Sequence, residues 1–264
     1  MAVVTRPTLL RAAGIGVFAG GLSGLFGVGG GILIVPALVV LLGFDQRLAH
    51  GTSLTAIVPI SAGGVLGFAV RGEVDWAVAG AMAVGAIAGA PIGAAALRRL
   101  PVRALRVGFA ALLVVTAVRM VLSTPDATGR DELDALLGAG LAGTGLLSGV
   151  LAGLMGVGGG IIMVPAQVLL FDIPDTVAKG TSLAVIIPTA VVATWRNIRH
   201  RTTDVPTGLT LGIAGTLSAA AMAQVAIGLD ATVSAVLFAL LLVATATHML
   251  LRMRRPSVAP VEEP

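Results

Sequence analysis

The chain has little charge and no cysteine. Only 11% of its 264 residues are charged, whereas 56% are hydrophobic and the mean hydropathy is +1.01. A soluble domain carries about 25% charged residues, so this sequence cannot cover a water-facing surface. The lack of cysteine excludes disulfides, thiol relays and electron carriers that use paired thiols. The apolar runs are continuous rather than alternating, which excludes a β-barrel. The composition therefore predicts an all-α, polytopic helical membrane protein.

Reactive residue sets are missing as well. The chain has no HExxH pair, no GxSxG elbow and no P-loop ending, and its three histidines are far apart. We therefore expect no enzyme, with no catalytic residue, no metal and no cofactor. No Asp or Glu falls in the middle of an apolar run, which argues against a buried carboxylate for a coupling cation and fits an anionic substrate.

Basic residues give the sequence a pI near 11.2. Most of them lie in the tails and the short connections between apolar runs, where membrane topology places Lys and Arg. This distribution indicates contact with the lipid bilayer and not with nucleic acid.

One sequence element occurs twice. A glycine cluster, a proline five residues later and a Gly-Thr-Ser-Leu stretch stand at 27–31, Pro36 and 51–54, and again at a constant offset of 129 residues. An ungapped overlay of 16–59 on 145–188 gives 23 identities in 44 positions. The chain is therefore predicted to contain two copies of one unit, 8–122 and 135–251, followed by a disordered cytoplasmic tail at 252–264.

Each copy is expected to contain about five helical segments. They fall at roughly 10–27, 32–43, 53–70, 76–97 and 103–122, then at 135–156, 161–171, 182–196, 205–228 and 231–251. A full span needs about 20 residues, so the second segment of each copy is too short alone. We interpret it as half of a helix broken at the glycine cluster, which gives five crossings per copy. The alternative is a re-entrant short segment, with eight or fewer spans and possibly a parallel repeat.

Basic residues also predict the orientation. When the cluster at 98–106 is placed in the cytoplasm, 13 of the 17 Lys and Arg fall on that side, together with both termini. An odd number of crossings makes the second copy enter from the opposite side. The sequence thus predicts inverted-topology repeats in a multi-pass protein of the bacterial cytoplasmic membrane.

The glycine breaks are the candidate substrate site. A glycine cluster that opens a short helix presents free backbone N–H groups and the positive end of a helix dipole, and two clusters related by inversion would meet near the bilayer centre. Tight helix crossing is the alternative role for the glycines. The candidate substrate-binding residues are Gly27, Gly29, Gly30, Gly31, Thr52, Ser53, Gly156, Gly158, Gly159, Gly160, Thr181 and Ser182.

Three further groups of residues have simpler explanations. The hydroxyls of the two Thr-Ser pairs are as well suited to capping helices as to binding a ligand. His50 and Lys179, directly before the Gly-Thr-Ser triplets, fit solvated loops better than attraction of an anion. The glycines at four-residue spacing in 16–24 and 145–153 are typical of close helix packing in lipid.

The doubled GVGGG-x4-P and GTSL elements resemble the TauE/SafE family of sulfite and organosulfonate exporters, over essentially 8–251. This resemblance implies a multi-pass inner-membrane transporter that moves sulfite, sulfoacetate or related anions out of the cytoplasm, with the motif residues as its functional residues. The expected function is a secondary transporter that exports a small anion, sulfite or an organosulfonate. A channel-like anion pore and a non-transporting membrane scaffold are the alternatives, and the oligomeric state is left open.

The inverted topology makes a direct prediction. Reporter domains fused within 71–75 and within 197–204, which occupy equivalent positions in the two copies, should report opposite sides of the membrane. Alkaline phosphatase and fluorescent-protein fusions in cells measure this. Two fusions on the same side would rule the inversion out.

Overall fold

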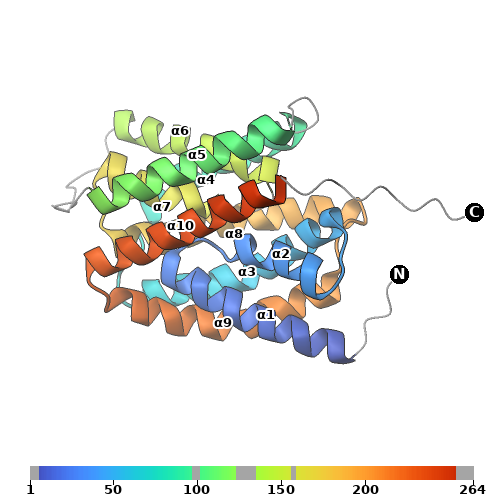
Figure 1. The fold of residues 1–264 in the computed structure, drawn as a ribbon. Helices are drawn as coiled ribbons and strands as arrows, with labels where there is room; N and C mark the ends of the chain where they lie inside the picture. The colour runs from blue at the N-terminus through green and yellow to red at the C-terminus, as the bar shows by residue number, and fades with distance from the viewer. Residues whose placement is uncertain (1–5, 97–101, 123–134, 156–158, 254–264) are drawn as a thin grey trace, which may run out of the picture.

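A computed structural model describes residues 6–96, 102–122, 135–155 and 159–253. The described residues form α-helices and no strand (Figure 1), and seven of these helices are long and apolar enough to span a membrane. The predicted all-α, polytopic class is therefore confirmed. The helices are α1 (Arg6–Phe26), α2 (Gly31–Leu41), α3 (Gln46–Ala69), α4 (Trp76–Ala96), α5 (Val102–Leu122), α6 (Ala135–Met155), α7 (Gly160–Phe171), α8 (Asp175–Arg199), α9 (Val205–Ile227) and α10 (Ala231–Met253).

The helix boundaries repeat with the sequence. Each helix from α1 to α5 begins 129 residues before its counterpart from α6 to α10, the same offset that separates the two motifs. The two copies therefore fold into the same succession of long, short and long helices. Of the predicted tail, α10 includes 252–253 and the remainder lies outside the described residues.

The short helices turn back. Gly30, just before α2, packs against Ala19 in the second half of α1. Leu41, at the end of α2, lines the same groove as Arg11 near the start of α1, so α2 runs back along α1. In the second copy, Gly159 packs against Ser148, and Phe171 lies beside Gly140. Our interpretation of α2 and α7 as continued crossings is therefore wrong, and the re-entrant alternative describes the chain path. Each copy therefore folds as one hairpin, α1–α2 or α6–α7, followed by three further helices.

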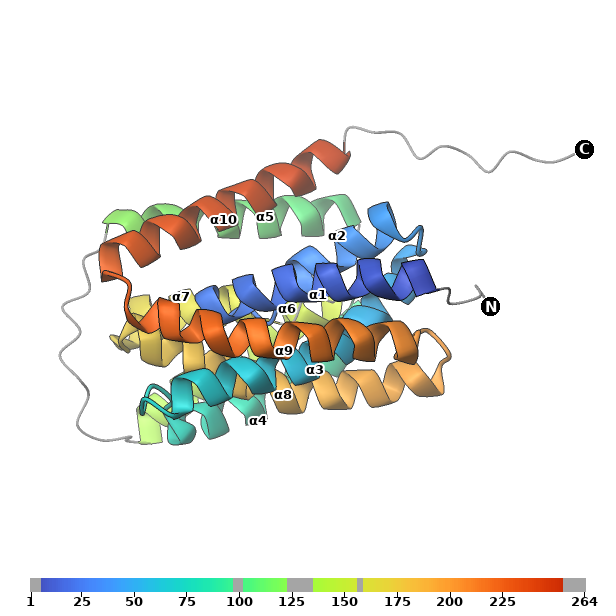
Figure 2. The ribbon, with the colours of Figure 1, turned by 90° about the horizontal axis from the view of Figure 1, so that it is seen from below.

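The two copies interlock through α3 and α8. These equivalent helices pack side by side and run in opposite directions, because the residues after α3 contact the first turns of α8 and those after α8 contact the first turns of α3. Around this pair, α1 packs on α9 and α6 packs on α4, each across the two copies. The start of α1 and the end of α10 lie at the same end of the bundle (Figures 1 and 2).

Glycine rows make the crossings between copies close. A Cβ on Gly16, Gly20 or Gly24 would overlap the backbone of α9, and one on Gly145 or Gly149 would overlap the backbone of α4. Backbones approach this closely because the glycine at each contact has no side chain. The packing role predicted for these rows agrees with the contacts.

Two helices start earlier than the sequence predicted. The structure begins α3 at Gln46 and α8 at Asp175, so the Gly-Thr-Ser triplets lie one to two turns inside their helices. The cap of α3 is Asp45, whose carboxylate accepts from the N–H groups of Arg47 and Leu48 at 2.9 and 3.0 Å. The capping role considered for Thr52, Ser53, Thr181 and Ser182 is therefore wrong.

Two glycines of α1 provide a matched test of the crossing. Gly20→Ala should destabilise the protein by about 1–3 kcal/mol, because its methyl group overlaps Gly215 in α9. Gly14→Ala should be neutral or stabilising, since no atom lies within 4 Å of the added Cβ. Thermal unfolding of both variants in detergent measures the difference, and equal stabilities would contradict the close crossing.

Candidate functional site

The first glycine cluster forms a sharp turn between α1 and α2. Gly27, Gly29 and Gly30 have φ angles of 71°, 79° and 77°, in the left-handed region that side chains avoid. Gly27 still donates to Ser23 in α1 at 2.8 Å, but the N–H groups of Val28, Gly29 and Gly30 have no acceptor among the described residues. The turn, which we call the first hinge (27–30), therefore leaves three amide donors at the start of α2 without a partner among the described residues.

The two hairpins meet at this hinge. Gly160, the first residue of α7, is so close that an added Cβ would lie 2.9 Å from the carbonyl oxygen of Gly27 and from the Cα of Val28. The Ser182 hydroxyl in α8 donates to the same carbonyl at 2.8 Å. Four predicted residues, Gly27, Gly159, Gly160 and Ser182, thus lie together. The predicted residues Gly156 and Gly158 lie outside the described residues.

Apolar side chains from the α3–α8 pair enclose the hinge. A Cβ on Gly29 would lie 3.1 Å from Ile186 in α8 and 3.5 Å from Ile57 in α3. Ser53 lies one turn before Ile57 on the same face of α3, and its hydroxyl is fully buried with no hydrogen-bond partner among the described residues. The hinge residues are themselves buried, so this conformation holds the hinge closed.

The two threonines of the motif turn away from the hinge. Thr52 in α3 accepts from the N–H of Asp204, and Thr181 in α8 accepts from the N–H of Asp75, both at 3.0 Å. Asp204 and Asp75 lie just before α9 and α4, so each threonine fixes the start of a helix in the other copy. The structure thus gives Thr52 and Thr181 a structural role in place of capping.

The glycine before each threonine permits this contact. A Cβ on Gly51 would overlap the carbonyl of Thr202, and one on Gly180 would overlap the carbonyl of Glu73. In the Gly-Thr-Ser triplet, glycine therefore admits a neighbouring loop, threonine bonds that loop, and, in the second copy, serine bonds the hinge.

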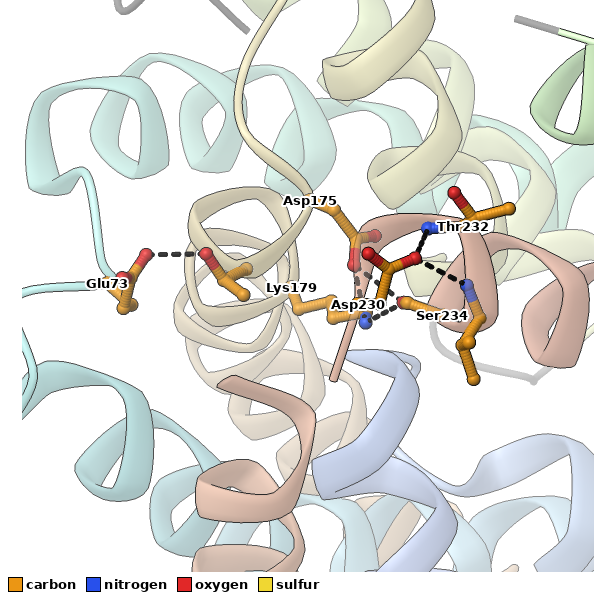
Figure 3. A network of polar contacts seen from close by, with 8 residues as sticks. Glu73, Asp175, Lys179, Asp230, Thr232 and Ser234 are labelled. Carbon is orange, nitrogen blue, oxygen red and sulfur yellow. Dashed lines mark hydrogen bonds and ion pairs between the residues drawn. The ribbon is translucent and has the colours of Figure 1, made fainter. Parts of the chain in front are cut away.

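Lys179 lies where the sequence predicted a solvated loop, and that prediction is wrong. Its side chain is 1% exposed, and its Nζ lies 2.7 Å from Oδ2 of Asp175 and 2.5 Å from Oγ of Ser234 in α10. Ser234 donates in turn to the same Asp175 oxygen at 2.6 Å (Figure 3). Sequence reasoning missed this cluster, although the four-residue spacing of Asp175 and Lys179 was a signal for an ion pair on one helix face.

Comparison with known proteins covers nearly the whole chain. The family described as "Sulfite exporter TauE/SafE" matches residues 2–120 and 141–264. The chain belongs to this family. It is 27% identical over 226 residues to a "Probable membrane transporter protein" of Xylella fastidiosa strain 9a5c, covering 82% of this chain and 87% of the relative. It is 29% identical over 198 residues to the "Probable membrane transporter protein YunE" of Bacillus subtilis, covering 65% and 71%. A Haemophilus influenzae relative with the same description as the first is 33% identical over 159 residues, covering 57% and 59%.

TauE/SafE proteins are membrane transporters, so the chain is a multi-pass membrane protein, as its seven candidate spans also indicate.

At the end of the bundle where α8 begins, polar contacts surround the Lys179 cluster (Figure 3). Thr176 donates to Glu73 at 2.6 Å. Asp230, before α10, accepts from the N–H groups of Thr232 and Val233, which lower the pKa of its carboxyl. The Asp230 carboxylate therefore stays charged until the pH falls through that lowered pKa.

The motif threonines provide the next test. Thr181→Val should lower the stability of the folded protein by about 1–3 kcal/mol, because it leaves the N–H of Asp75 without a partner. Thr52→Val should do the same at Asp204. Thr210→Val is the control, since that hydroxyl donates to Pro206 in its own helix. Thermal unfolding and anion flux are measured for each variant. A variant that loses flux but keeps full stability would indicate that its threonine hydroxyl binds the substrate.

Proposed function

We propose that the protein exports a small anion, sulfite or an organosulfonate, from the cytoplasm through the hinge region. One observation carries the proposal: the N-terminal ends of two helices, α2 and α7, meet in the protein interior beside amide groups that have no acceptor among the described residues. Helix N-terminal ends and free amides attract negative charge, and burial strengthens that attraction because the local dielectric is low.

The substrate-binding set is the first hinge, the start of α7 and the motif serines. Gly27, Gly29, Gly30 and Gly31 supply backbone in this assignment, as do Gly159 and Gly160. Ser53 supplies a buried hydroxyl that no described group occupies. Ser182 holds the hinge in shape through the carbonyl of Gly27.

The membrane potential favours export. A potential that is negative inside is worth about 2.3 kcal/mol per charge per 100 mV and drives anions outward. Export of an anion therefore needs no coupling cation. We infer that the hairpin of each copy opens from its own side of the bacterial cytoplasmic membrane, with both termini in the cytoplasm. The opposite directions of α3 and α8 support this inverted arrangement.

Flux measurements test the function. Purified protein in liposomes loaded with sulfite, or with an anionic sulfonate such as sulfoacetate, should release the anion with saturable kinetics and should catalyse counterflow. Protein-free liposomes are the control. Flux without saturation or counterflow would favour a channel, and no flux of any anion would favour a scaffold.

The two motif serines test the site. Ser53→Ala should raise the KM for the anion several-fold and leave stability unchanged, because its hydroxyl bonds no described group. Ser182→Ala should lower stability by about 1 kcal/mol, since it removes the bond to Gly27. Flux and unfolding temperature are compared for both. Unchanged KM in Ser53→Ala would remove Ser53 from the site.

A further inference from the structure

The proposed export site leaves one buried charge unused. Lys179 is the largest buried ionisable side chain of the described residues, and it is bonded only within the Lys179 cluster of Lys179, Asp175 and Ser234. A lysine in a protein interior needs an anion beside it, because an unpaired buried charge is costly. Its partner in this conformation is Asp175.

The two partners differ in how well they tolerate separation. Lys179 is 1% exposed, whereas Asp175 is 16% exposed and lies in the first turn of α8, where the helix dipole stabilises a carboxylate. Asp175 also keeps the hydrogen bond from Ser234 if the lysine leaves. Asp175 can therefore lose Lys179, whereas Lys179 can leave Asp175 only for another anion.

The proposed anion site, the first hinge, lies directly beside the lysine. The backbone of Lys179 touches the first hinge: a Cβ on Gly27 would lie 2.6 Å from the Cα of Lys179 and 2.8 Å from its Cβ. The lysine side chain thus begins at the hinge and ends at α10. A small anion at the hinge and the carboxylate of Asp175 compete for the same ammonium group.

We propose that Lys179 binds the negatively charged head of the substrate in exchange for Asp175. The exchange removes the bond from Lys179 to Ser234 and so partly releases α10 from α8, with only the Ser234–Asp175 hydrogen bond left in this cluster. The inference rests on the proposed function, since it needs an anion at the hinge. An ammonium group is a compact charge with three rotatable donors, so it accepts trigonal and tetrahedral oxyanion heads alike. The substrate class is therefore a small molecule with one oxyanion head, which includes sulfite and sulfonates.

The partly released helix, α10, packs on the residue just before the hinge. Phe238 of α10 packs on Phe26 at the end of α1, with ring centroids 5.6 Å apart. Phe238 and Leu242 are fully buried in the same apolar cluster as Phe26 and Val28. Figure 2 shows α10 beside α5 at one edge of the bundle, and the two helices pack on each other. The Lys179 cluster therefore latches a helix that closes the site.

The latch belongs to the second copy alone. The residues equivalent to Asp175, Lys179 and Ser234 in the first copy are Gln46, His50 and Leu105, which cannot form the same ion pair. The exchange therefore controls the end of the bundle at which α8 begins, and the other end opens without it.

Neutralising the pair tests the proposal. The double variant Asp175→Asn, Lys179→Met removes both charges, so it should fold, and its KM for sulfite should rise about tenfold or more because a charge-assisted bond is lost. Asp175→Asn alone should lower the KM several-fold, since Lys179 loses its internal competitor. Arg71→Gln is the control: it removes an exposed positive charge near the same end and should leave the KM unchanged.

The outcomes separate this inference from the proposed function. If the wild-type protein transports no anion, the proposed function fails. If the wild type transports sulfite and the folded double variant has an unchanged KM, Lys179 does not bind the substrate and the inference is overturned. Circular dichroism and gel filtration of the double variant establish that it is folded.

Release of α10 has its own readout. Because the chain has no cysteine, Leu242→Cys introduces a single thiol that is buried in the closed conformation. Sulfite should increase the rate at which a maleimide labels this thiol several-fold, and the increase should disappear when the Asp175→Asn, Lys179→Met pair is added. A labelling rate that sulfite does not change in the Leu242→Cys variant alone would contradict the release.

Discussion

Backbone that is not helical must be enclosed when it lies in a membrane, and this constraint explains most of the fold. The first hinge breaks the helical hydrogen-bond pattern in the protein interior, where lipid offers no replacement partner. The structure encloses it with the start of α7, with α8 and with the apolar cluster that includes α10. The Ser182 hydroxyl donates to one carbonyl of the hinge, that of Gly27. The proposed anion site depends on the hinge amide groups that have no acceptor among the described residues.

The packing of the two copies against each other also helps to enclose the non-helical backbone. Each hairpin packs partly against the other copy, since α1 packs on α9 and α6 packs on α4. Glycine rows make these crossings close, and the motif threonines fix the helix starts that belong to the other copy. The Lys179 cluster adds a difference between the copies, because only the second one carries the ion pair.

The sequence predicted the elements better than their directions. The glycine spacing and the repeat predicted two equivalent sets of five helices, and the helix starts agree with that offset. Hydropathy does not say whether an 11-residue helix continues a crossing or turns back, because both paths bury the same residues. The direction of α2 is set by the left-handed φ angles at Gly27, Gly29 and Gly30 and by packing of Gly30 on Ala19. The early start of α3 was missed because Asp45 caps a polar first turn that hydropathy assigns to a loop.

The sequence by itself determined the membrane class, the duplication and the glycine breaks, because these follow from composition and local spacing. Only the tertiary structure decided which hydroxyls face the hinge. Thr52 and Ser53 are neighbours in sequence, yet the threonine bonds a loop of the other copy while the serine lies on the hinge face of α3. It also decided that Lys179 is buried, because Ser234, 55 residues away, lies beside it. The partners of a buried charge are set by packing between distant segments, and the local sequence does not contain that information.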